Sequence, residues 1–295
     1  MFSLAMQGLN NSIGSPRSDQ EDGVSGVAGI SRRRCLMAEH MAQRVSIIIV
    51  SHDLHDYLER CVVSIQRHTE KDRVEELVIV DNASTKPIAR SRLTELTAFP
   101  VLLVRLEGNA SYAHANNRGV AVARGDYVCF MNNDVEVLPG WLEPLYAVID
   151  ADVNVGAVGP KMIFPDGTIQ FAGYEINPAT GFQKHRFREA RVHHSIKDAN
   201  IAGPVTNLTG ACLLMRTEDA RFDERYWYGC EDTDLCVQLK QKNKKVYYQP
   251  ASMVIHHEEK TRSSGAIEID YEQNRELFRK KWGRDWQQYL WQVIT

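Results

Sequence analysis

Four short apolar runs, each followed by a stretch with helical spacing or a polar turn, constrain the fold of this chain most strongly. The first, residues 45–50, is almost entirely β-branched, which is typical of a strand buried on both faces. The other three are residues 76–81, 101–106 and 126–131. This alternation of strand and helix predicts an α/β fold with a mostly parallel central sheet and helices on both faces.

Polar clusters end three of these runs. Ser51 and Asp53 follow the first strand, Asp81 closes the second, and residues 132–136, Asn-Asn-Asp-Val-Glu, follow the fourth. The carboxyl ends of parallel strands meet at one edge of a sheet, and ligands bind in the crevice beyond it. The sequence therefore predicts a ligand site that brings these three clusters together.

The composition argues against several classes of protein. The 295 residues carry a formal net charge of −3, so there is no overall basic surface of the kind that binds nucleic acid. The six cysteines form no CxxC pair, which argues against a zinc site or a disulfide framework and favours a reducing, cytoplasmic compartment. No apolar run approaches the ~18 residues that span a bilayer. Any membrane contact would therefore be peripheral, at the inner face of the cell membrane.

The chain divides by composition into four parts. The first is rich in Ser, Gly, Asn and charge without a sustained period, which predicts a disordered leader, and Met37 and Met41 are alternative starts. The second holds the strand–helix repeats, the third contains a Pro- and Gly-punctuated excursion at 164–204, and the last is a helical tail. The predicted bounds are residues 1–43, 44–160, 161–265 and 266–295.

Asp134 and Glu136 are the first candidates for chemistry. They are two positions apart in an extended segment, so both carboxylates can face one point. Hard oxygen ligands of this kind suit Mg²⁺ or Mn²⁺ that bridges a diphosphate. D-x-E is a weak signal by itself, and a solvent-exposed strand end with turn residues is the competing interpretation.

Glu231 and Asp232 form a second acidic pair, directly after the aromatic residues Tyr226, Trp227 and Tyr228. Aromatic faces beside carboxylates are common at sugar sites, and a carboxylate in partly apolar surroundings becomes a better base. The same acids lie where a helix should begin, and stabilisation by the helix dipole explains them equally well.

Two further segments are candidates. His256 and His257 end an apolar strand, and imidazole is a suitable third ligand for Mn²⁺, although adjacent strand residues face opposite ways and only one can join a given site. A structural histidine is the competing interpretation. The stretch EGNASYAHANNRG, residues 107–119, is too polar for a core. Its small residues would let backbone or side-chain amides approach a ligand closely. An Asn-capped surface helix explains it equally well.

Taken in order, these segments resemble the family 2 glycosyltransferases of the GT-A fold, over residues 44–264. The blocks that carry the resemblance are VSIIIVSHD, LVIVDNAS, GNASYAHANNRG, GDYVCFMNNDVEV, TGACLLMR, FDERYWYGCEDTDLC and PASMVIHH. The branch that the chain resembles most includes rhamnosyl- and galactofuranosyltransferases of bacterial surface polysaccharides. The resemblance implies a Rossmann-like sheet with a smaller acceptor-side subregion.

The resemblance also implies roles for individual residues. Asp134, Glu136 and His256 would hold the metal ion, Mn²⁺ or Mg²⁺, and Asp232 matches the catalytic base, with Glu231 beside it. The residues implied in binding the nucleotide sugar are Ser51, Asp53, Asp81, Asn109, Asn116, Arg118 and Asn133. Those implied on the acceptor side are Gly210, Ala211, Tyr226 and Trp227. The first-strand loop departs from the family, since it reads Ser-His-Asp where the family usually has Thr-Tyr-Asn.

The implied activity is an inverting, metal-dependent transfer of a hexosyl or deoxyhexosyl group from a UDP- or dTDP-linked donor. The implied acceptor is a hydroxyl of a growing surface glycan or glycolipid. A sugar-phosphate nucleotidyltransferase is disfavoured, because residues 51–61 contain no Gly-rich phosphate loop. A non-catalytic nucleotide-sugar-binding module on the same fold is disfavoured, because Asp134 and Asp232 are both present.

Overall fold

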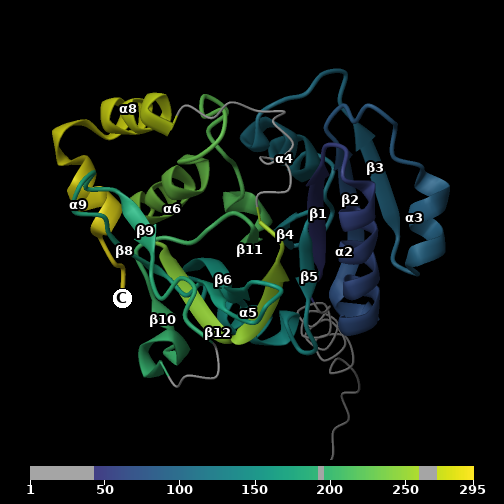
Figure 1. Ribbon diagram of the computed structural model, residues 1–295, viewed down its shortest axis with the longest axis horizontal. Coiled ribbons are helices and arrows are strands. Elements are labelled where there is room, and N and C mark those ends of the chain that lie inside the picture. Colours follow the sequence, from purple (N-terminus) through teal and green to yellow (C-terminus); the bar gives the residue numbers. More distant parts are fainter. Residues whose placement is uncertain (1–42, 192–195, 259–270) are drawn as a thin grey trace, which may run out of the picture. The chain divides into compact units, whose positions relative to one another are not determined.

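The computed structural model describes residues 43–191, 196–258 and 271–295, and Figure 1 shows how their elements are arranged. The predicted leader, residues 1–43, lies outside the described residues except for Gln43. Among the helices that are described, none has both the length and the apolar character needed to cross a bilayer.

The first half of the chain forms the predicted parallel sheet. In space the strand order is β4-β1-β2-β3, and every neighbouring pair in this part is parallel. The apolar side chains of the first strand, Ile47, Ile48 and Ile49, are fully buried, as a strand covered on both faces requires. The elements are β1 (Val45–Ser51), α2 (His55–His68), β2 (Val74–Asp81), α3 (Arg90–Leu96), β3 (Val101–Arg105), α4 (Tyr112–Val120) and β4 (Tyr127–Asn132).

The second half extends the same sheet beyond β4, in the order β4-β11-β6-β12-β10 (Figure 1). β11 runs antiparallel to both β4 and β6, whereas β12 is parallel to β6. A short strand, β5, pairs antiparallel with the end of β12. The elements are β5 (Val135–Val137), α5 (Leu142–Ala151), β6 (Val155–Ile163), β11 (Cys212–Arg216), α6 (Glu231–Gln241) and β12 (Lys245–His256).

The excursion at 164–204 is more regular than a loop. β7 pairs with β6 at the sheet edge, and β8 and β9 form a separate two-stranded sheet. Gly173 and Gly181 have φ values of 94° and 71°, so these glycines make the turns between short strands. The described elements of the excursion are β7 (Ile169–Phe171), β8 (Tyr174–Ile176), β9 (Gln183–His185), η2 (Lys197–Asn200) and β10 (Gly203–Pro204).

The C-terminal segment is tied to α6 through one buried carboxylate. The tail contains α8 (Tyr271–Trp282), the turn η4 (Gly283–Asp285) and α9 (Trp286–Trp291). Asp234 of α6 is fully buried and accepts hydrogen bonds from Lys281 Nζ at 2.6 Å and Trp282 Nε1 at 2.8 Å. Lys240 Nζ, also on α6, donates to the carbonyl oxygen of Leu290 at 3.0 Å. The tail therefore holds the helix that begins with Glu231 and Asp232.

We expect Asp234→Ala to lower the free energy of unfolding by about 3–5 kcal/mol, because it leaves Lys281 and several buried donors without their shared acceptor. Urea unfolding measures the change. Glu272→Ala is the matched control: its partners Arg275 and Arg279 lie on the protein surface, so its effect should stay below about 1 kcal/mol. Equal effects of the two substitutions would contradict this account of the tail.

Candidate active site

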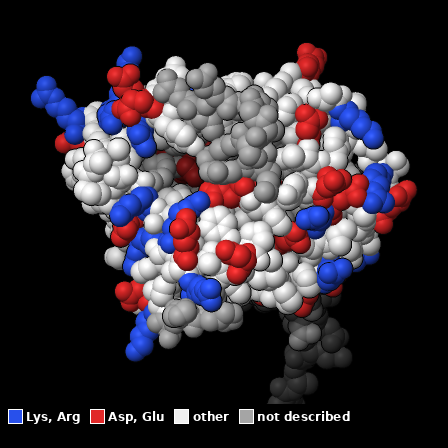
Figure 2. All heavy atoms as spheres, in the orientation of Figure 1, with Lys and Arg blue, Asp and Glu red and all other residues white. Residues whose placement is uncertain are grey.

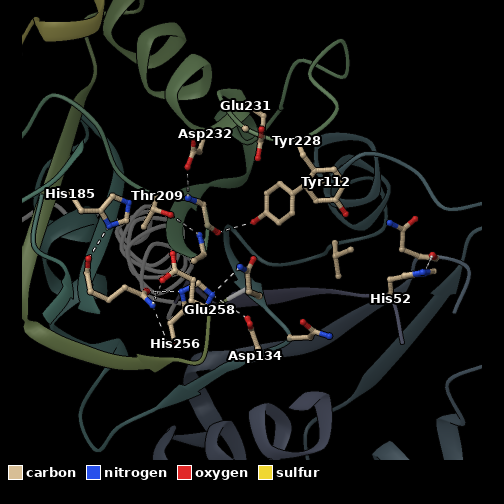
Figure 3. Close-up of a pocket in the computed structure, with 18 of the residues that line it drawn as sticks. His52, Tyr112, Asp134, His185, Thr209, Tyr228, Glu231, Asp232, His256 and Glu258 are labelled. Carbon is tan, nitrogen blue, oxygen red and sulfur yellow. Dashed lines mark hydrogen bonds and ion pairs between the residues drawn. The ribbon is translucent and has the colours of Figure 1, made fainter. Parts of the chain in front are cut away.

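A cavity of about 260 Å³ lies beyond the ends of β1 and β4, where the sequence predicts a ligand site (Figure 3). Elements from both halves of the chain contribute to its wall. The lining residues that were predicted from the sequence are Asn133, Asp134, Gly210, Ala211, Glu231, Asp232 and His256. The structure therefore brings four predicted residues into one cavity: Glu231 and Asp232 at the start of α6, Asp134 after β4, and His256 at the end of β12.

Asp134 and His256 lie side by side in the wall of this cavity. Asp134 Oδ1 is 3.2 Å from His256 Nε2, and both side chains are largely buried. Their closeness follows from strand pairing, since β5 runs antiparallel to β12 and sets Val135 opposite His256. Burial by itself would raise the pKa of Asp134, but the charge and hydrogen bond of His256 outweigh it and hold that pKa below its usual value.

Gln170 of β7 fixes the orientation of the His256 ring. Its Oε1 lies 2.7 Å from His256 Nδ1, and its Nε2 donates to the backbone oxygen of His256 at 3.1 Å. Nδ1 therefore carries the proton, and Nε2 is directed at Asp134. A histidine that binds a metal ion usually donates its second N–H to an oxygen in this way. One carboxylate and one oriented imidazole fit part of the coordination sphere of Mn²⁺ or Mg²⁺, and phosphate oxygens and water would complete it.

Glu136 does not join this pair. Its Oε1 lies 2.7 Å from Nε2 of His257, and it is absent from the cavity lining. The prediction that Asp134 and Glu136 face one point assumed a continuous extended segment. Residues 133–134 instead form a turn between β4 and β5, which interrupts the alternation of side chains. Within the described residues, no group of three or more His, Cys, Asp or Glu side chains is arranged to hold a metal ion.

Asp232 lies in the first turn of α6, and its carboxylate is oriented by two backbone N–H groups. Oδ2 accepts from Gly210 at 3.1 Å, and Oδ1 accepts from Thr233 at 2.7 Å. The carbonyl of Gly210 in turn accepts from Tyr112 Oη at 2.8 Å, which fixes that loop. Burial raises the pKa of Asp232, although the hydrogen bonds oppose the shift, so the carboxylate is a stronger base than an exposed one.

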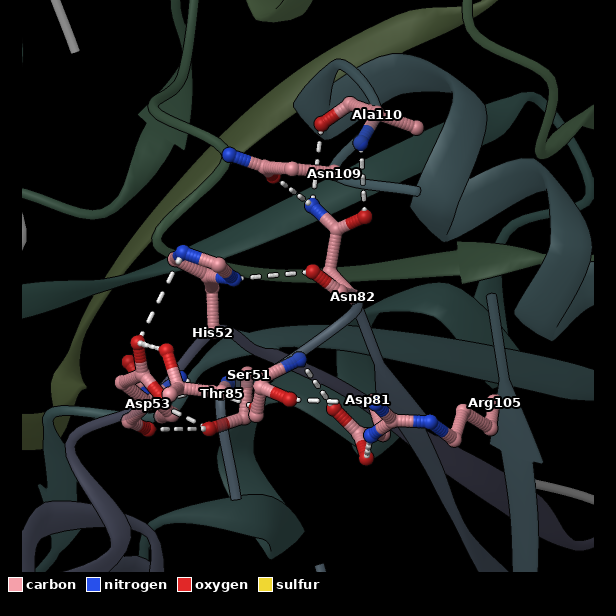
Figure 4. A network of polar contacts seen from close by, with 11 residues as sticks. Ser51, His52, Asp53, Asp81, Asn82, Thr85, Arg105, Asn109 and Ala110 are labelled. Atoms are coloured by element: carbon pink, nitrogen blue, oxygen red, sulfur yellow. Dashed lines mark hydrogen bonds and ion pairs between the residues drawn. The ribbon is translucent and has the colours of Figure 1, made fainter. Parts of the chain in front are cut away.

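Asp81 is engaged in holding the loop after β2 rather than lining the cavity. Its side chain is about 1% exposed, it accepts from the backbone N–H groups of Ser84 at 2.8 Å and Ile88 at 3.1 Å, and it forms an ion pair with Arg105 (Figure 4). Burial opposes these contacts, yet together they lower the pKa of Asp81. In this structure Asp81 shapes the loop, and its neighbour Asn82 lines the cavity. Contact of Asp81 with the nucleobase or ribose stays a prediction.

Hydrogen bonds from the loop after β1 and from the Asn-rich block at 107–119 help to hold the wall of the cavity in place. Ser51 Oγ accepts from Asn133 Nδ2 at 2.9 Å, and Asp53 Oδ1 accepts from the backbone of Thr85 at 2.8 Å. Asn109 Oδ1 accepts from Asn82 Nδ2 at 2.9 Å, within the network that Figure 4 shows. None of Ser51, Asp53 and Asn109 is among the residues that line this cavity.

Two other predicted donor-side residues lie elsewhere on α4. Asn116 is buried, and its Nδ2 donates to the carbonyl oxygen of Tyr112 at 2.9 Å, inside the same helix. Arg118 is exposed and lines a second cavity of about 350 Å³ together with Arg105 and His114. Neither side chain is part of the wall of the first cavity.

The aromatic residue before α6 that lines the cavity is not one of those that were predicted. Tyr226 is fully buried, and its hydroxyl donates to Asp234 Oδ1 at 3.1 Å. Trp227 is 47% exposed and is not among the lining residues, whereas Tyr228 and Gly229 are. Gly229 has a φ of 90°, so the chain makes a left-handed turn directly after Tyr228.

Several lining residues were missed from the sequence. Asn82 and Asn132 directly adjoin predicted residues, so their position at a strand end was a usable signal. Glu258 follows His256 and His257 and could have been found in the same way. Gln170, Tyr174 and His185 had no signal, because they reach the cavity only through the pairing of β7, β8 and β9. On the face that Figure 2 shows, Lys and Arg are interspersed with Asp and Glu, and acidic atoms are visible in a hollow.

Comparison with known proteins decides the family. The model of the family described as "Glycosyl transferase family 2" matches residues 46–222, which is more than half of the chain. The chain belongs to glycosyl transferase family 2. As a member of this family, it is a glycosyltransferase.

Curated relatives of this glycosyltransferase agree with the predicted branch. It is 31% identical over 237 residues to the O-antigen biosynthesis protein RfbC of Myxococcus xanthus, across 77% of this chain but 18% of that protein. It is 26% identical over 255 residues to an N-acetylglucosaminyl-diphospho-decaprenol L-rhamnosyltransferase of Mycobacterium tuberculosis, across 76% of this chain and 79% of that protein. The resemblance to rhamnosyltransferase-like members of the family is therefore confirmed.

Solved structures confirm the GT-A fold of this glycosyltransferase. GalNAc-T7 with UDP, GalNAc and Mn²⁺ superposes with a TM-score of 0.61 at 20% identity, over 73% of this chain and 43% of that one. TarS 1-349 of S. aureus in complex with UDP-GlcNAc superposes with a TM-score of 0.55 at 18% identity, over 80% of this chain and 65% of that one. At this level of identity the likeness establishes the fold alone.

Proposed function

We propose that this glycosyltransferase is metal-dependent and inverting, and that it moves a sugar from a UDP- or dTDP-linked donor to a hydroxyl of a surface glycan or lipid-linked glycan. One observation carries the proposal: Asp134 and His256 share a cavity with Asp232, a partly buried carboxylate with a raised pKa. A pair of potential metal ligands and a candidate base, on three separate elements, are what a single displacement at a sugar carbon requires.

In this proposal Asp134 and His256 hold Mn²⁺ or Mg²⁺ at the diphosphate of the donor. The cation supplies Lewis-acid stabilisation of the charge that develops on the leaving diphosphate. Gln170 holds the His256 ring so that Nε2 is directed at the site. His52 and Asn82, which line the cavity at the ends of β1 and β2, are placed for contact with the nucleoside.

Asp232 is the proposed general base. The N–H groups of Gly210 and Thr233 hold its carboxylate in place, and the Thr233 hydroxyl lies 3.3 Å from Oδ1. A lone pair of Oδ2 is then available to take the proton of the acceptor hydroxyl. The acceptor oxygen then attacks the anomeric carbon from the face opposite the diphosphate, and one displacement inverts that centre. Tyr228, at the same end of the cavity, is placed to contact the acceptor sugar.

The choice of acceptor rests on the relatives. By their names, one of the two relatives acts in O-antigen biosynthesis, and the other is a rhamnosyltransferase for N-acetylglucosaminyl-diphospho-decaprenol, a lipid-linked sugar. The chain matches only 18% of the first of these proteins, so the proposal concerns the transferase unit and not that whole protein.

A thermal-shift screen tests the donor class. UDP, dTDP, GDP, UDP-GlcNAc and dTDP-rhamnose are each added with and without Mn²⁺. We expect one uridine or thymidine compound to raise the midpoint of unfolding in a metal-dependent way, because a ligand that binds the folded state stabilises it by mass action. Stabilisation by none of these compounds, or equal stabilisation with EDTA present, would contradict the proposal.

A further inference from the structure

His185 occupies the cavity wall near Asp232 but has no part in the mechanism described above. It ends β9, in the two-stranded sheet of the 164–204 excursion, and Figure 3 shows it on the same side of the cavity as Thr209 and Asp232. Both side chains, His185 and Asp232, line the same cavity. The question is what a partly buried imidazole does at this end of the cavity.

The protonation state of the His185 ring follows from one contact. Nδ1 lies 2.8 Å from the backbone oxygen of Gln170. A carbonyl oxygen can only accept a hydrogen bond, so Nδ1 must carry the proton. In a neutral imidazole the other nitrogen is then an acceptor, and Nε2 presents a lone pair.

The surroundings keep the ring neutral and its orientation fixed. Burial, assisted by the charge of Arg188, lowers the pKa of His185 despite its hydrogen bond to Gln170 and the nearby charges of Glu258 and Asp232. The rings of Phe171 and Tyr174 pack edge-on against the imidazole, with centroids 5.6 Å and 5.1 Å away. Within the described part of the chain, Nε2 makes no hydrogen bond to another residue.

A nitrogen that accepts a hydrogen bond can pair only with a group that donates one. Ionised diphosphate oxygens carry no proton, so they would be repelled by the lone pair of Nε2. The hydroxyl groups of a sugar are donors of the right kind. We propose that Nε2 of His185 accepts a hydrogen bond from a sugar hydroxyl that is bound next to Asp232, and that His185 thereby determines specificity. This inference rests on the proposed function and assigns a role to the excursion that carries β9.

Two substitutions, His185→Asn and His185→Gln, test the hydrogen bond of Nδ1 and that of Nε2 separately. In His185→Asn the shorter amide can still donate to the carbonyl of Gln170 but has no acceptor at the position of Nε2. In His185→Gln the longer amide can place an oxygen there. We expect His185→Asn to lower kcat/KM by about 10-fold or more, since an unpaired buried hydroxyl is costly, and His185→Gln to recover part of the loss. Lys184→Ala is the control, because this neighbour on β9 is half-exposed and pairs with Glu175 at the surface.

The source of the hydroxyl, donor or acceptor sugar, is distinguished by two assays with the nucleotide sugar that the thermal-shift screen selects. A hydroxyl on the donor sugar would make His185→Asn slow hydrolysis of that compound in the absence of acceptor and raise its KM. A hydroxyl on the acceptor would leave hydrolysis unchanged and raise KM for the acceptor alone. Either pattern supports the assignment, provided that the variant unfolds at the wild-type temperature.

Donor analogues with one hydroxyl at a time replaced by fluorine give a readout that a merely structural role would not move, because fluorine cannot donate a hydrogen bond. If the donor supplies the hydroxyl, wild-type protein should discriminate against one analogue and His185→Asn should not. The assignment is overturned if a folded His185→Asn keeps wild-type KM and kcat for both substrates. If the wild-type protein neither transfers nor hydrolyses any sugar nucleotide, the proposed function itself fails, and the two failures are thus distinguishable.

Discussion

Asp232→Asn should lower kcat by about 10²–10⁴-fold while the affinity for the nucleotide sugar stays nearly unchanged, because the amide cannot take a proton from the acceptor hydroxyl. The substitution keeps an oxygen that can accept from Gly210 or Thr233, so the loop and the start of α6 should retain their geometry. Steady-state kinetics and titration calorimetry with donor and Mn²⁺ measure the two quantities separately. Full turnover by the variant would exclude Asp232 as the base.

Asp56→Asn is a matched control for the competing interpretation of Asp232 as a helix-dipole residue. Asp56 is likewise an acid in the first turn of a helix, α2, but it is exposed and does not line the cavity. If the charge at a helix start were the whole role of Asp232, both substitutions would change stability by a few tenths of a kcal/mol and neither would change kcat. We expect only Asp232→Asn to affect turnover.

The pH profile gives an independent check on the base. Burial raises the folded-state pKa of Asp232, so the carboxylate is deprotonated and active at higher pH, and activity falls as the pH drops through that raised pKa. The acid limb of kcat should therefore lie above 3.8, the ordinary value for aspartate. In Asp232→Asn this limb should be absent.

Asp134→Ala should weaken Mn²⁺-dependent binding of UDP or dTDP by at least about 10-fold, since loss of even an indirect metal contact costs that much. The carboxylate is largely buried, lines the cavity and lies 3.2 Å from His256 Nε2. Calorimetry with and without EDTA measures the effect. The difference between variant and wild type should vanish when the metal is removed.

Glu136→Ala is the control that separates the structure from the sequence motif. The motif implies that Glu136 shares the metal, whereas the structure pairs Glu136 with His257 at 2.7 Å outside the cavity lining. We therefore expect Glu136→Ala to bind nucleotide and Mn²⁺ nearly as the wild type does. Equal losses in Asp134→Ala and Glu136→Ala would mean that the carboxylate of Glu136 turns inward when the ion binds.

The parts of the site that were predicted from the sequence are those that backbone rules determine. Asp134, Asp232 and His256 lie at or next to the ends of regular elements, and the ends of strands in this kind of sheet point to one edge. The order of the family's motifs along the chain added their roles. These inferences need only the positions of the strand ends, which the apolar pattern predicts.

The misplaced residues are those whose role depends on where a side chain points. Asp81 was predicted at the nucleotide because it ends β2, yet the N–H groups of Ser84 and Ile88 and the side chain of Arg105 use its oxygens. Which groups bind the carboxylate oxygens of Asp81 depends on how the loop folds back over β2. The order of residues does not specify the path of that loop. Tyr226 was predicted on the acceptor side, yet it is fully buried and donates to Asp234, and Tyr228 lines the cavity.

The sequence by itself determined the family, the parallel half of the sheet and the edge at which a ligand would bind, because apolar periodicity and motif order are properties of the chain read locally. Only the tertiary structure decided that Gln170 orients His256, that Glu136 pairs with His257 and that His185 enters the cavity. Each of these depends on pairing between strands that are distant in the chain, and such contacts are chosen by the packing of the whole domain.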